Sequence, residues 1–155
     1  MNYWLFKTEP DECSIDDFAR APTTPIVWEG VRNYQARNFL RDNVAIGDQV
    51  FIYHSSCKDI GIAGIARVVK AAYPDPSQFD NHSRYFDSKA TGQKPRWVAV
   101  DLQFVSKMSQ LIRLDKLKNL ATLIELPLVR KGNRLSVMPV TCAQWLTIMA
   151  LSQPA

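Results

Sequence analysis

The histidines and cysteines are the side chains of this sequence that most readily supply metal ligands or a nucleophile. His54 and Cys57 are three residues apart, and His82 is the other of the two histidines. A zinc site needs about four such ligands, so this spacing does not predict a metal site. A Cys57 nucleophile with His54 or His82 as its base is conceivable, but one histidine near one cysteine is a common coincidence. Because GxSxG, P-loop and dinucleotide-binding motifs are also missing, the sequence predicts no cofactor and does not require an enzyme.

Aromatic residues beside small polar residues are a second signal. Trp28 precedes Glu29 and Gly30, Tyr34 lies at the start of a predicted helix, and Trp97 lies at the start of a predicted strand. A planar base stacked on such a ring gains about 1 to 3 kcal/mol, and neighbouring polar groups can then read its edge. The segment after Trp28 therefore indicates a pocket for a base or nucleoside, with packing in a hydrophobic core as the alternative role.

Hydrophobic periodicity predicts the elements that must position these residues. Strands are predicted at 3–7, 49–54, 60–70, 97–104 and 135–140, and helices at 15–20, 32–42, 113–123 and after 141. Ser14 with Asp17, and Thr141 with Gln144, have the spacing of capping boxes at helix starts. Strands outnumber helices and no regular βαβ alternation is present, which favours a barrel-like α+β domain.

Two features predict irregular backbone between these elements. Gly64 lies inside a predicted strand, which indicates a bend or the close approach of another backbone. Residues 73–94 are polar and have no hydrophobic period, and so long a connection inside a compact domain is usually functional or disordered.

The length and charge of the chain limit its class. The 155 residues, 46% of them hydrophobic, fit one globular domain, and no apolar run approaches a membrane span. Residues 1–30 carry a net charge of −4, so the remainder carries +8 of the total of +4. A basic surface of this kind could attract a polyanion, although ordinary solubility charge is the alternative. Three cysteines without a CxxC motif, and the absence of a signal-like N-terminus, predict a reduced, cytoplasmic protein.

Six sequence blocks resemble the EVE domain family. They are YWLFKTEP (3–10), WEGVRNYQARN (28–38), GDQVFIYHS (47–55), GIAGIARV (61–68), PDPSQFD (74–80) and PLVRKGNRLSVMPV (127–140). The blocks follow the family order over nearly the whole chain, so a single domain is expected at 1–152 with a tail at 153–155. The resemblance implies a PUA-like mixed β-barrel flanked by short helices, related to YTH domains, and a pocket for a modified base flipped out of nucleic acid.

The resemblance also implies site residues. The expected base pocket comprises Trp28, Asn33, Tyr34, His54, Ser55, Ser56 and Trp97. Phosphate or base-edge contacts are expected from a basic turn that contains Arg130, Lys131, Asn133 and Arg134. Further candidates lie in the long polar connection, namely Phe79, Asp80, Ser83 and Tyr85.

The function expected from this pocket is non-catalytic recognition of a modified base, such as a methylated or hydroxymethylated cytosine or a methylated adenine. The choice between RNA and DNA binding stays open, as does the oligomeric state. Flipping a paired base costs a few kcal/mol, which favours single-stranded or already unpaired substrate. One buried methyl group contributes roughly 0.8 kcal/mol, about fourfold in affinity, so a reader also needs hydrogen bonds to the base edge.

A hydrolase is the alternative function. The expected barrel is similar to that of ASCH domains, some of which hydrolyse modified pyrimidine nucleosides with lysine, threonine and glutamate, and Lys7, Thr8 and Glu9 match those residue types. Adjacent strand residues point to opposite faces, so Lys7 and Glu9 share a side that Thr8 does not join. A surface ion pair between Lys7 and Glu9 is the structural alternative. A protein-interaction module, a third possibility, predicts a large exposed apolar patch instead of a basic pocket rim.

Overall fold

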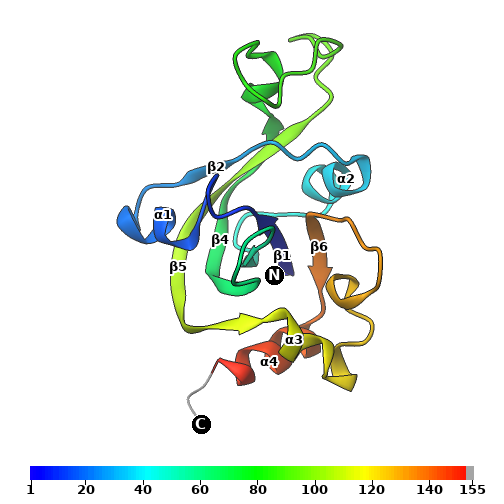
Figure 1. Cartoon of the computed structure of the whole chain (residues 1–155). Coiled ribbons are helices and arrows are strands. Elements are labelled where there is room, and N and C mark those ends of the chain that lie inside the picture. The colour runs from blue at the N-terminus through cyan, green and yellow to red at the C-terminus, as the bar shows by residue number, and fades with distance from the viewer. Residues whose placement is uncertain (153–155) are drawn as a thin grey trace.

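A six-stranded sheet with strand order β2-β5-β4-β3-β1-β6 organises the computed structural model, which describes residues 1–152 (Figure 1). The strands are β1 (Tyr3–Thr8), β2 (Ile26–Trp28), β3 (Gln49–His54), β4 (Gly61–Pro74), β5 (Val98–Arg113) and β6 (Val137–Val140). The helices are α1 (Ile15–Arg20), α2 (Tyr34–Asp42), α3 (Leu114–Lys118) and α4 (Cys142–Leu151), with short 3₁₀ turns η1 (Pro76–Phe79), η2 (Ala121–Leu123) and η3 (Pro127–Val129). Only the β1–β3 pair is parallel among these strands. The predicted mixed α+β class is confirmed, whereas the predicted tail at 153–155 lies outside the described residues.

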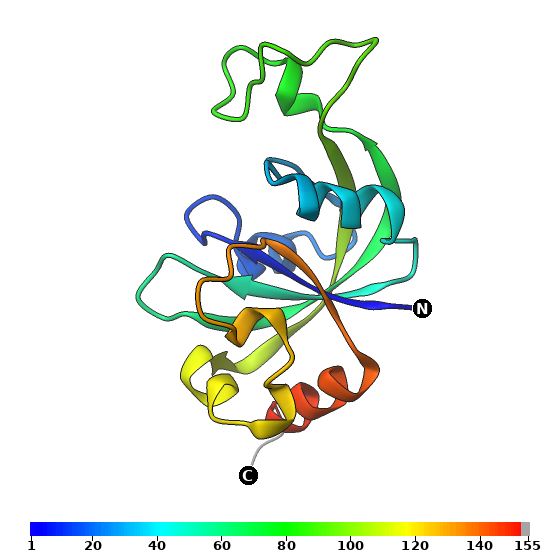
Figure 2. The ribbon, with the colours of Figure 1, turned by 90° about the vertical axis from the view of Figure 1, so that its right-hand side faces the viewer.

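The sheet buries side chains on both of its faces. In β1, Trp4 and Phe6 belong to one hydrophobic cluster, while Leu5 between them belongs to the other. Helices α1 and α2 pack on the first face, and α3 and α4 pack on the second, so the sheet lies between two layers of helix (Figure 2). This arrangement explains why β1 and β3 contain unbroken apolar runs, at 4–6 and 50–53, instead of alternating apolar and polar residues.

The helix starts agree with the predicted caps. Ser14 and Asp17 form a capping box at α1, and Thr141 and Gln144 form one at α4. In each case the side-chain oxygen of the first residue accepts from a backbone N–H of the first turn, at Asp17 and at Gln144, and such a cap commonly contributes about 1 kcal/mol. No helix within residues 1–152 is long and apolar enough to span a membrane.

The long strands β4 and β5 pair with several register shifts, which bend them. A Cβ atom on Gly64 would lie 2.4 Å from Cδ1 of Ile15 and 2.6 Å from the carbonyl oxygen of Ser106, so the predicted close approach at this glycine is confirmed. Strand β5 continues to Arg113 instead of ending at residue 104, because β4 supplies hydrogen-bonding partners as far as Gly61. The helix predicted over 113–123 is accordingly reduced to α3 followed by η2.

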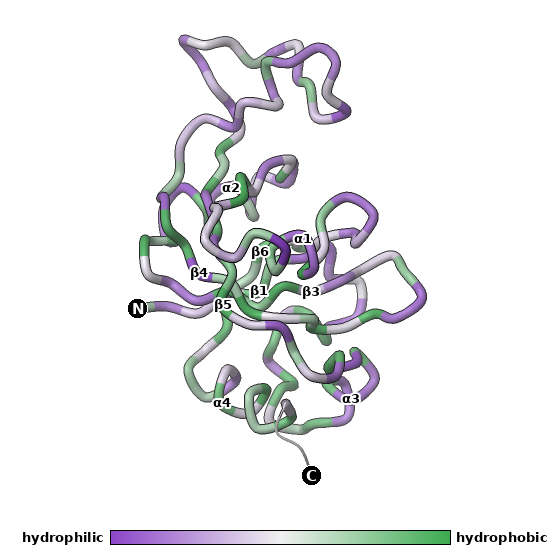
Figure 3. The backbone as a smooth tube through the Cα atoms, turned by 90° about the vertical axis from the view of Figure 1, so that its left-hand side faces the viewer, coloured by the Kyte–Doolittle hydropathy of each residue, from purple (hydrophilic) through white to green (hydrophobic). Residues whose placement is uncertain are grey.

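The connection between β4 and β5 projects from one end of the molecule and is mainly hydrophilic (Figure 3). It is ordered by the buried side chain of Gln78. The amide nitrogen of Gln78 donates to the carbonyls of Asp75 and Trp97 at 2.8 and 2.7 Å, and its oxygen accepts from the backbone N–H groups of Arg96 and Trp97 at 2.9 Å. The side-chain amide of Gln78 therefore joins both ends of the connection. Of the two roles predicted for residues 73–94, a functional segment is favoured over a disordered one.

Candidate functional site

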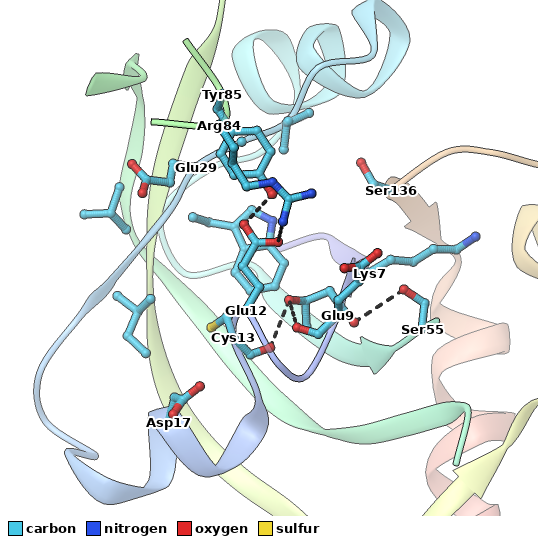
Figure 4. Close-up of a pocket in the computed structure, with 16 residues that line it drawn as sticks. Lys7, Glu9, Glu12, Cys13, Asp17, Glu29, Ser55, Arg84, Tyr85 and Ser136 are labelled. Carbon is cyan, nitrogen blue, oxygen red and sulfur yellow. Dashed lines mark hydrogen bonds and ion pairs between the residues drawn. The ribbon is translucent and has the colours of Figure 1, made fainter. Parts of the chain in front are cut away.

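A cavity of about 620 Å³ opens where β1 ends beside β2 (Figure 4). Its lining comes from the end of β1, the segment that follows it, helix α1, strand β2 with residues 29–31, residues 84–85 of the β4–β5 connection, and single residues after β3 and before β6. The volume falls in the range of roughly 300 to 1,000 Å³ that is usual for small-molecule sites. The cavity can therefore accept a single nucleobase.

Trp28 forms a rigid wall of this cavity. Its side chain is only 6% exposed and packs against Phe6 and Phe18, with ring centroids 5.6 and 6.4 Å apart. Strand β2 holds its backbone by pairing Trp28 with Val100 of β5. The core role and the pocket role considered for this tryptophan are therefore compatible, because the same ring that fills the first hydrophobic cluster also borders the cavity.

Carboxylates predominate among the charged groups of the lining. Four of them, Glu9, Glu12, Asp17 and Glu29, accompany two cations, Lys7 and Arg84. Burial raises the pKa of Glu29, and the nearby charge of Asp75 acts in the same direction. Burial lowers the pKa of the Lys7 ammonium. An acceptor-rich lining suits a base that carries an exocyclic amino group, and it disfavours a phosphate inside the cavity.

Tyr85 and Arg84 close one side of the cavity by reaching Glu12. The Tyr85 hydroxyl donates to Oε1 of Glu12, and Nη1 of Arg84 lies 3.8 Å from Oε2 of the same residue (Figure 4). Gly30 permits this arrangement, because a Cβ atom at its position would lie 2.6 Å from the Tyr85 ring. The Gly30 backbone has φ +85°, and its N–H donates to the buried Asp75 carboxylate at 2.8 Å.

Two of the residues expected in the base pocket, Trp28 and Ser55, line the cavity. The Ser55 N–H donates to the Thr8 carbonyl at 2.9 Å, which holds the end of β3 beside the end of β1. Ser56 follows with a positive φ of 55° and is not part of the lining.

Asn33 and His54 lie outside the lining and make hydrogen bonds that hold helices. The Asn33 side-chain oxygen accepts from the Ala36 N–H at 3.0 Å and caps α2. Nε2 of His54 accepts from the Ile15 N–H at 3.1 Å, at the start of α1. Burial lowers the pKa of His54, which keeps the ring in the neutral form that can accept this bond.

Tyr34 and Trp97 are brought together, but outside the cavity. Their ring centroids are 4.8 Å apart with an interplanar angle of 26°. Tyr85 lines the cavity, whereas the other residues suggested in the same connection do not, namely Phe79, Asp80 and Ser83.

The basic turn at 130–134 shortly precedes Ser136, a lining residue, in the sequence, but none of its residues lines the cavity. Arg130 forms an exposed ion pair with Glu125 at 2.7 Å. Asn133 is used within the turn, since its amide donates to the Pro127 carbonyl at 2.6 Å and its oxygen accepts from the Leu135 N–H at 3.0 Å. Lys131 and Arg134 are exposed, a few residues before Ser136, which lines the cavity.

Lys7, Thr8 and Glu9 all line the cavity. The predicted separation of Thr8 from the other two does not keep it out, because β1 ends at Thr8 and the chain turns there. The Thr8 hydroxyl donates to the Cys13 carbonyl at 2.9 Å. The ion pair suggested between Lys7 and Glu9 is not formed within the described residues, and the Lys7 amine lies 5.9 Å from the centroid of the Tyr53 ring.

Two features of the site are not predicted from the sequence, namely the acidic lining and the Asp75 carboxylate that holds Gly30 in place. Glu12 and Glu29 belong to the acidic N-terminal part of the sequence, and the net charge of that part does not by itself predict a site. Asp75 lies in the PDPSQFD block, but its role depends on Gly30, which is 45 residues away in the chain. No group of three or more His, Cys, Asp or Glu side chains in residues 1–152 is arranged to hold a metal ion.

Comparison with known proteins identifies the family. The profile of the EVE domain matches residues 2–151. The chain belongs to the EVE domain family. Thymocyte nuclear protein 1 of Gallus gallus is 38% identical to it over 167 residues, which is 97% of this chain and 69% of the relative.

Solved structures resemble this EVE domain along its whole length. A protein of Pseudomonas syringae is 54% identical with a TM-score of 0.94, covering 97% of this chain and 99% of the other. The human THYN1 protein, solved in complex with DNA that contains 5-methylcytosine, is 36% identical with a TM-score of 0.94, covering 100% and 99%. An ASCH protein of Zymomonas mobilis, 11% identical with a TM-score of 0.56, shares the fold alone.

Proposed function

We propose that this EVE domain binds DNA containing a modified cytosine and holds that base, flipped out of its strand, in the cavity beside Trp28 without catalysing a reaction on it. The observation that carries the proposal is the similarity, over the whole chain, to human THYN1 in complex with 5-methylcytosine-containing DNA. The cavity supports it independently, because it offers an aromatic wall and carboxylate acceptors in a space of about 620 Å³.

The chemistry of the lining favours cytosine. The exocyclic amino group of cytosine is a hydrogen-bond donor, and glutamate and aspartate are its usual partners in proteins. Glu29 adjoins Trp28 in the chain, and both residues line the cavity. Phosphates are repelled by the same carboxylates and remain outside, where Lys131 and Arg134 are exposed in the turn before Ser136.

Energetics set the expected selectivity. Burying one methyl group contributes roughly 0.8 kcal/mol, so methylated DNA should bind about fourfold tighter than unmodified DNA if burial acts alone. Flipping a base out of a duplex costs a few kcal/mol, so a single strand should bind more tightly than the matching duplex.

The test is a titration of labelled single-stranded oligonucleotides that differ only in 5-methylcytosine against cytosine. Trp28→Phe keeps an apolar ring in the core but shortens the wall of the cavity, so it should reduce the preference for the methylated strand. Trp145→Phe is the matched control, because Trp145 is also buried but belongs to the second hydrophobic cluster. Equal affinity of the wild-type protein for both strands would contradict the proposal.

Hydrolysis of a modified pyrimidine nucleoside is the second candidate, favoured by the presence of Lys7, Thr8 and Glu9 together in the lining. Incubation with N-acylated and alkylated nucleosides, followed by mass detection, separates the two functions. Turnover that Lys7→Met abolishes would establish the hydrolase, whereas binding without turnover supports the reader.

A further inference from the structure

We propose that Tyr34, Trp97 and Arg37 form a second nucleobase site outside the cavity, which stacks on an unflipped base of the same DNA strand. The identity of the ligand as DNA rests on the proposed function, but the site itself is argued from these side chains.

Tyr34 presents an exposed aromatic ring on a rigid support. It is 50% exposed at the first turn of α2, and its ring stacks on that of Trp97 at 4.8 Å. Trp97 is only 6% exposed and is fixed by two hydrogen bonds, from its Nε1 to Asp87 at 2.8 Å and from its backbone N–H to Gln78 at 2.9 Å. Because Tyr34 is stacked on this fixed Trp97 ring, it loses little conformational entropy when a base stacks on its exposed face.

The outer face of the Tyr34 ring is not covered by the nearby guanidinium. Arg37 lies 4.7 Å from the Tyr34 centroid and 6.0 Å from the Trp97 centroid. If Arg37 lay on the face of Tyr34 opposite Trp97, its distance to Trp97 would be much longer than its distance to Tyr34. The Arg37 guanidinium is therefore not centred on the far face of Tyr34, and this half-exposed residue has that face for a ligand.

Arg37 forms no ion pair within residues 1–152. Its guanidinium donates to the Arg96 carbonyl at 3.0 Å and to Oδ1 of Asn38 at 2.8 Å, which orient it beside Tyr34. A ring with an adjacent unpaired cation is the combination that single-stranded nucleic acids recognise, one group for the base and one for the phosphate.

A chain of contacts joins this site to the cavity. The Arg32 guanidinium lies 5.3 Å from the Trp97 centroid and 5.5 Å from that of Tyr85, which lines the cavity. Helix α2 and the β4–β5 connection lie at the same end of the molecule (Figure 1). A strand whose modified base enters the cavity therefore has a second aromatic surface close by for another of its bases.

The test compares wild type, Tyr34→Ala and Tyr34→Phe with single-stranded DNA that contains either 5-methylcytosine or cytosine. Stacking on one ring predicts that Tyr34→Ala weakens binding of both strands about fivefold or more, because it removes contacts outside the cavity. Tyr34→Phe keeps the ring and should bind within about twofold of wild type. Leu146→Ala, an exposed position on α4 at the other end of the molecule, is the control and should bind like wild type.

A direct readout places 2-aminopurine next to the 5-methylcytosine. Its fluorescence should be quenched on binding to wild type and Tyr34→Phe, and not on binding to Tyr34→Ala. Equal affinity of Tyr34→Ala and wild type for both strands would overturn the second site, as would failure of the wild type to bind either strand. If the wild type bound both strands equally, the proposed function would be refuted, while weaker binding of both strands by Tyr34→Ala would still support the second site.

Discussion

Gly30→Ala tests whether Tyr85 is held as a wall of the cavity. The positive φ of +85° costs an alanine roughly 1 to 2 kcal/mol. The added Cβ atom would also lie 2.6 Å from Cε2 of Tyr85, well inside the usual contact distance of about 3.5 to 4.0 Å, so the ring must move by about 1 Å. Tyr85 has little freedom to do so, because its carbonyl accepts from Arg32 at 2.7 and 3.1 Å and its hydroxyl donates to Glu12. Such overpacking adds about 1 to 3 kcal/mol.

Two other glycines provide the control for this substitution. Gly47 and Gly132 have φ values of +93° and +77°, and a Cβ atom on either would meet nothing within 4 Å. Gly47→Ala and Gly132→Ala therefore carry the backbone cost alone. In urea unfolding followed by tryptophan fluorescence, we expect Gly30→Ala to lose about 1 to 3 kcal/mol more than either control. Gly47→Ala is the control for affinity, because Gly47 lies outside the cavity lining and outside the basic turn, and Gly30→Ala should bind 5-methylcytosine DNA more weakly than it does. If all three variants had the same stability and the same affinity, the reasoning about Tyr85 would be refuted.

Three further predictions concern the groups that hold the site in place. Because burial lowers the pKa of His54 below its ordinary 6.5, the unfolded chain binds the proton first. The free energy of unfolding should therefore fall as the pH drops from 6.5 toward the lower pKa of His54 in the folded protein. The His54→Gln side chain can still accept a hydrogen bond from the Ile15 N–H but does not titrate. This variant should therefore show a smaller decline in urea titrations at several pH values. Asp75→Asn leaves the part-buried Arg32 without its carboxylate partner and should lower the free energy of unfolding by about 3 kcal/mol in the same assay. A loss below about 1 kcal/mol would contradict the role of Asp75 in holding this part of the cavity wall. Asn33→Ala should lose about 1 kcal/mol of stability while Asn33→Ser, an uncharged residue that also caps helices, retains it. Affinity for methylated DNA should equal that of wild type in both variants, and a large loss in Asn33→Ser would indicate that the Asn33 amide contacts the base.

Local rules predicted the elements whose signals lie within a few residues. Both capping boxes, at Ser14 and at Thr141, follow from the types of two residues three positions apart. The close approach at Gly64 followed from a glycine inside a strand. The sequence pattern predicts the end of β5 at residue 104, which is too early, because pairing with β4 through bulges continues the strand to Arg113 after its simple alternation stops.

The composition of the site depends on contacts between distant parts of the chain. Trp28 and Ser55 could be proposed from their neighbours and from the family resemblance, and both line the cavity. An asparagine side chain can either read the edge of a base or cap a helix, and the structure shows that Asn33 caps α2. His54 accepts from Ile15 across 39 residues, a pairing that local periodicity does not encode. The sequence predicts Tyr34 and Trp97 in the base pocket, but the fold stacks the two rings on each other outside the cavity.

A crystal structure of the protein with a short single-stranded oligonucleotide containing 5-methylcytosine tests the central claim most directly. We predict that the methylated base occupies the cavity against Trp28, with its amino group on a carboxylate of the lining and its phosphates outside. A complex in which the methylated base lies elsewhere and the cavity holds only solvent would contradict the account.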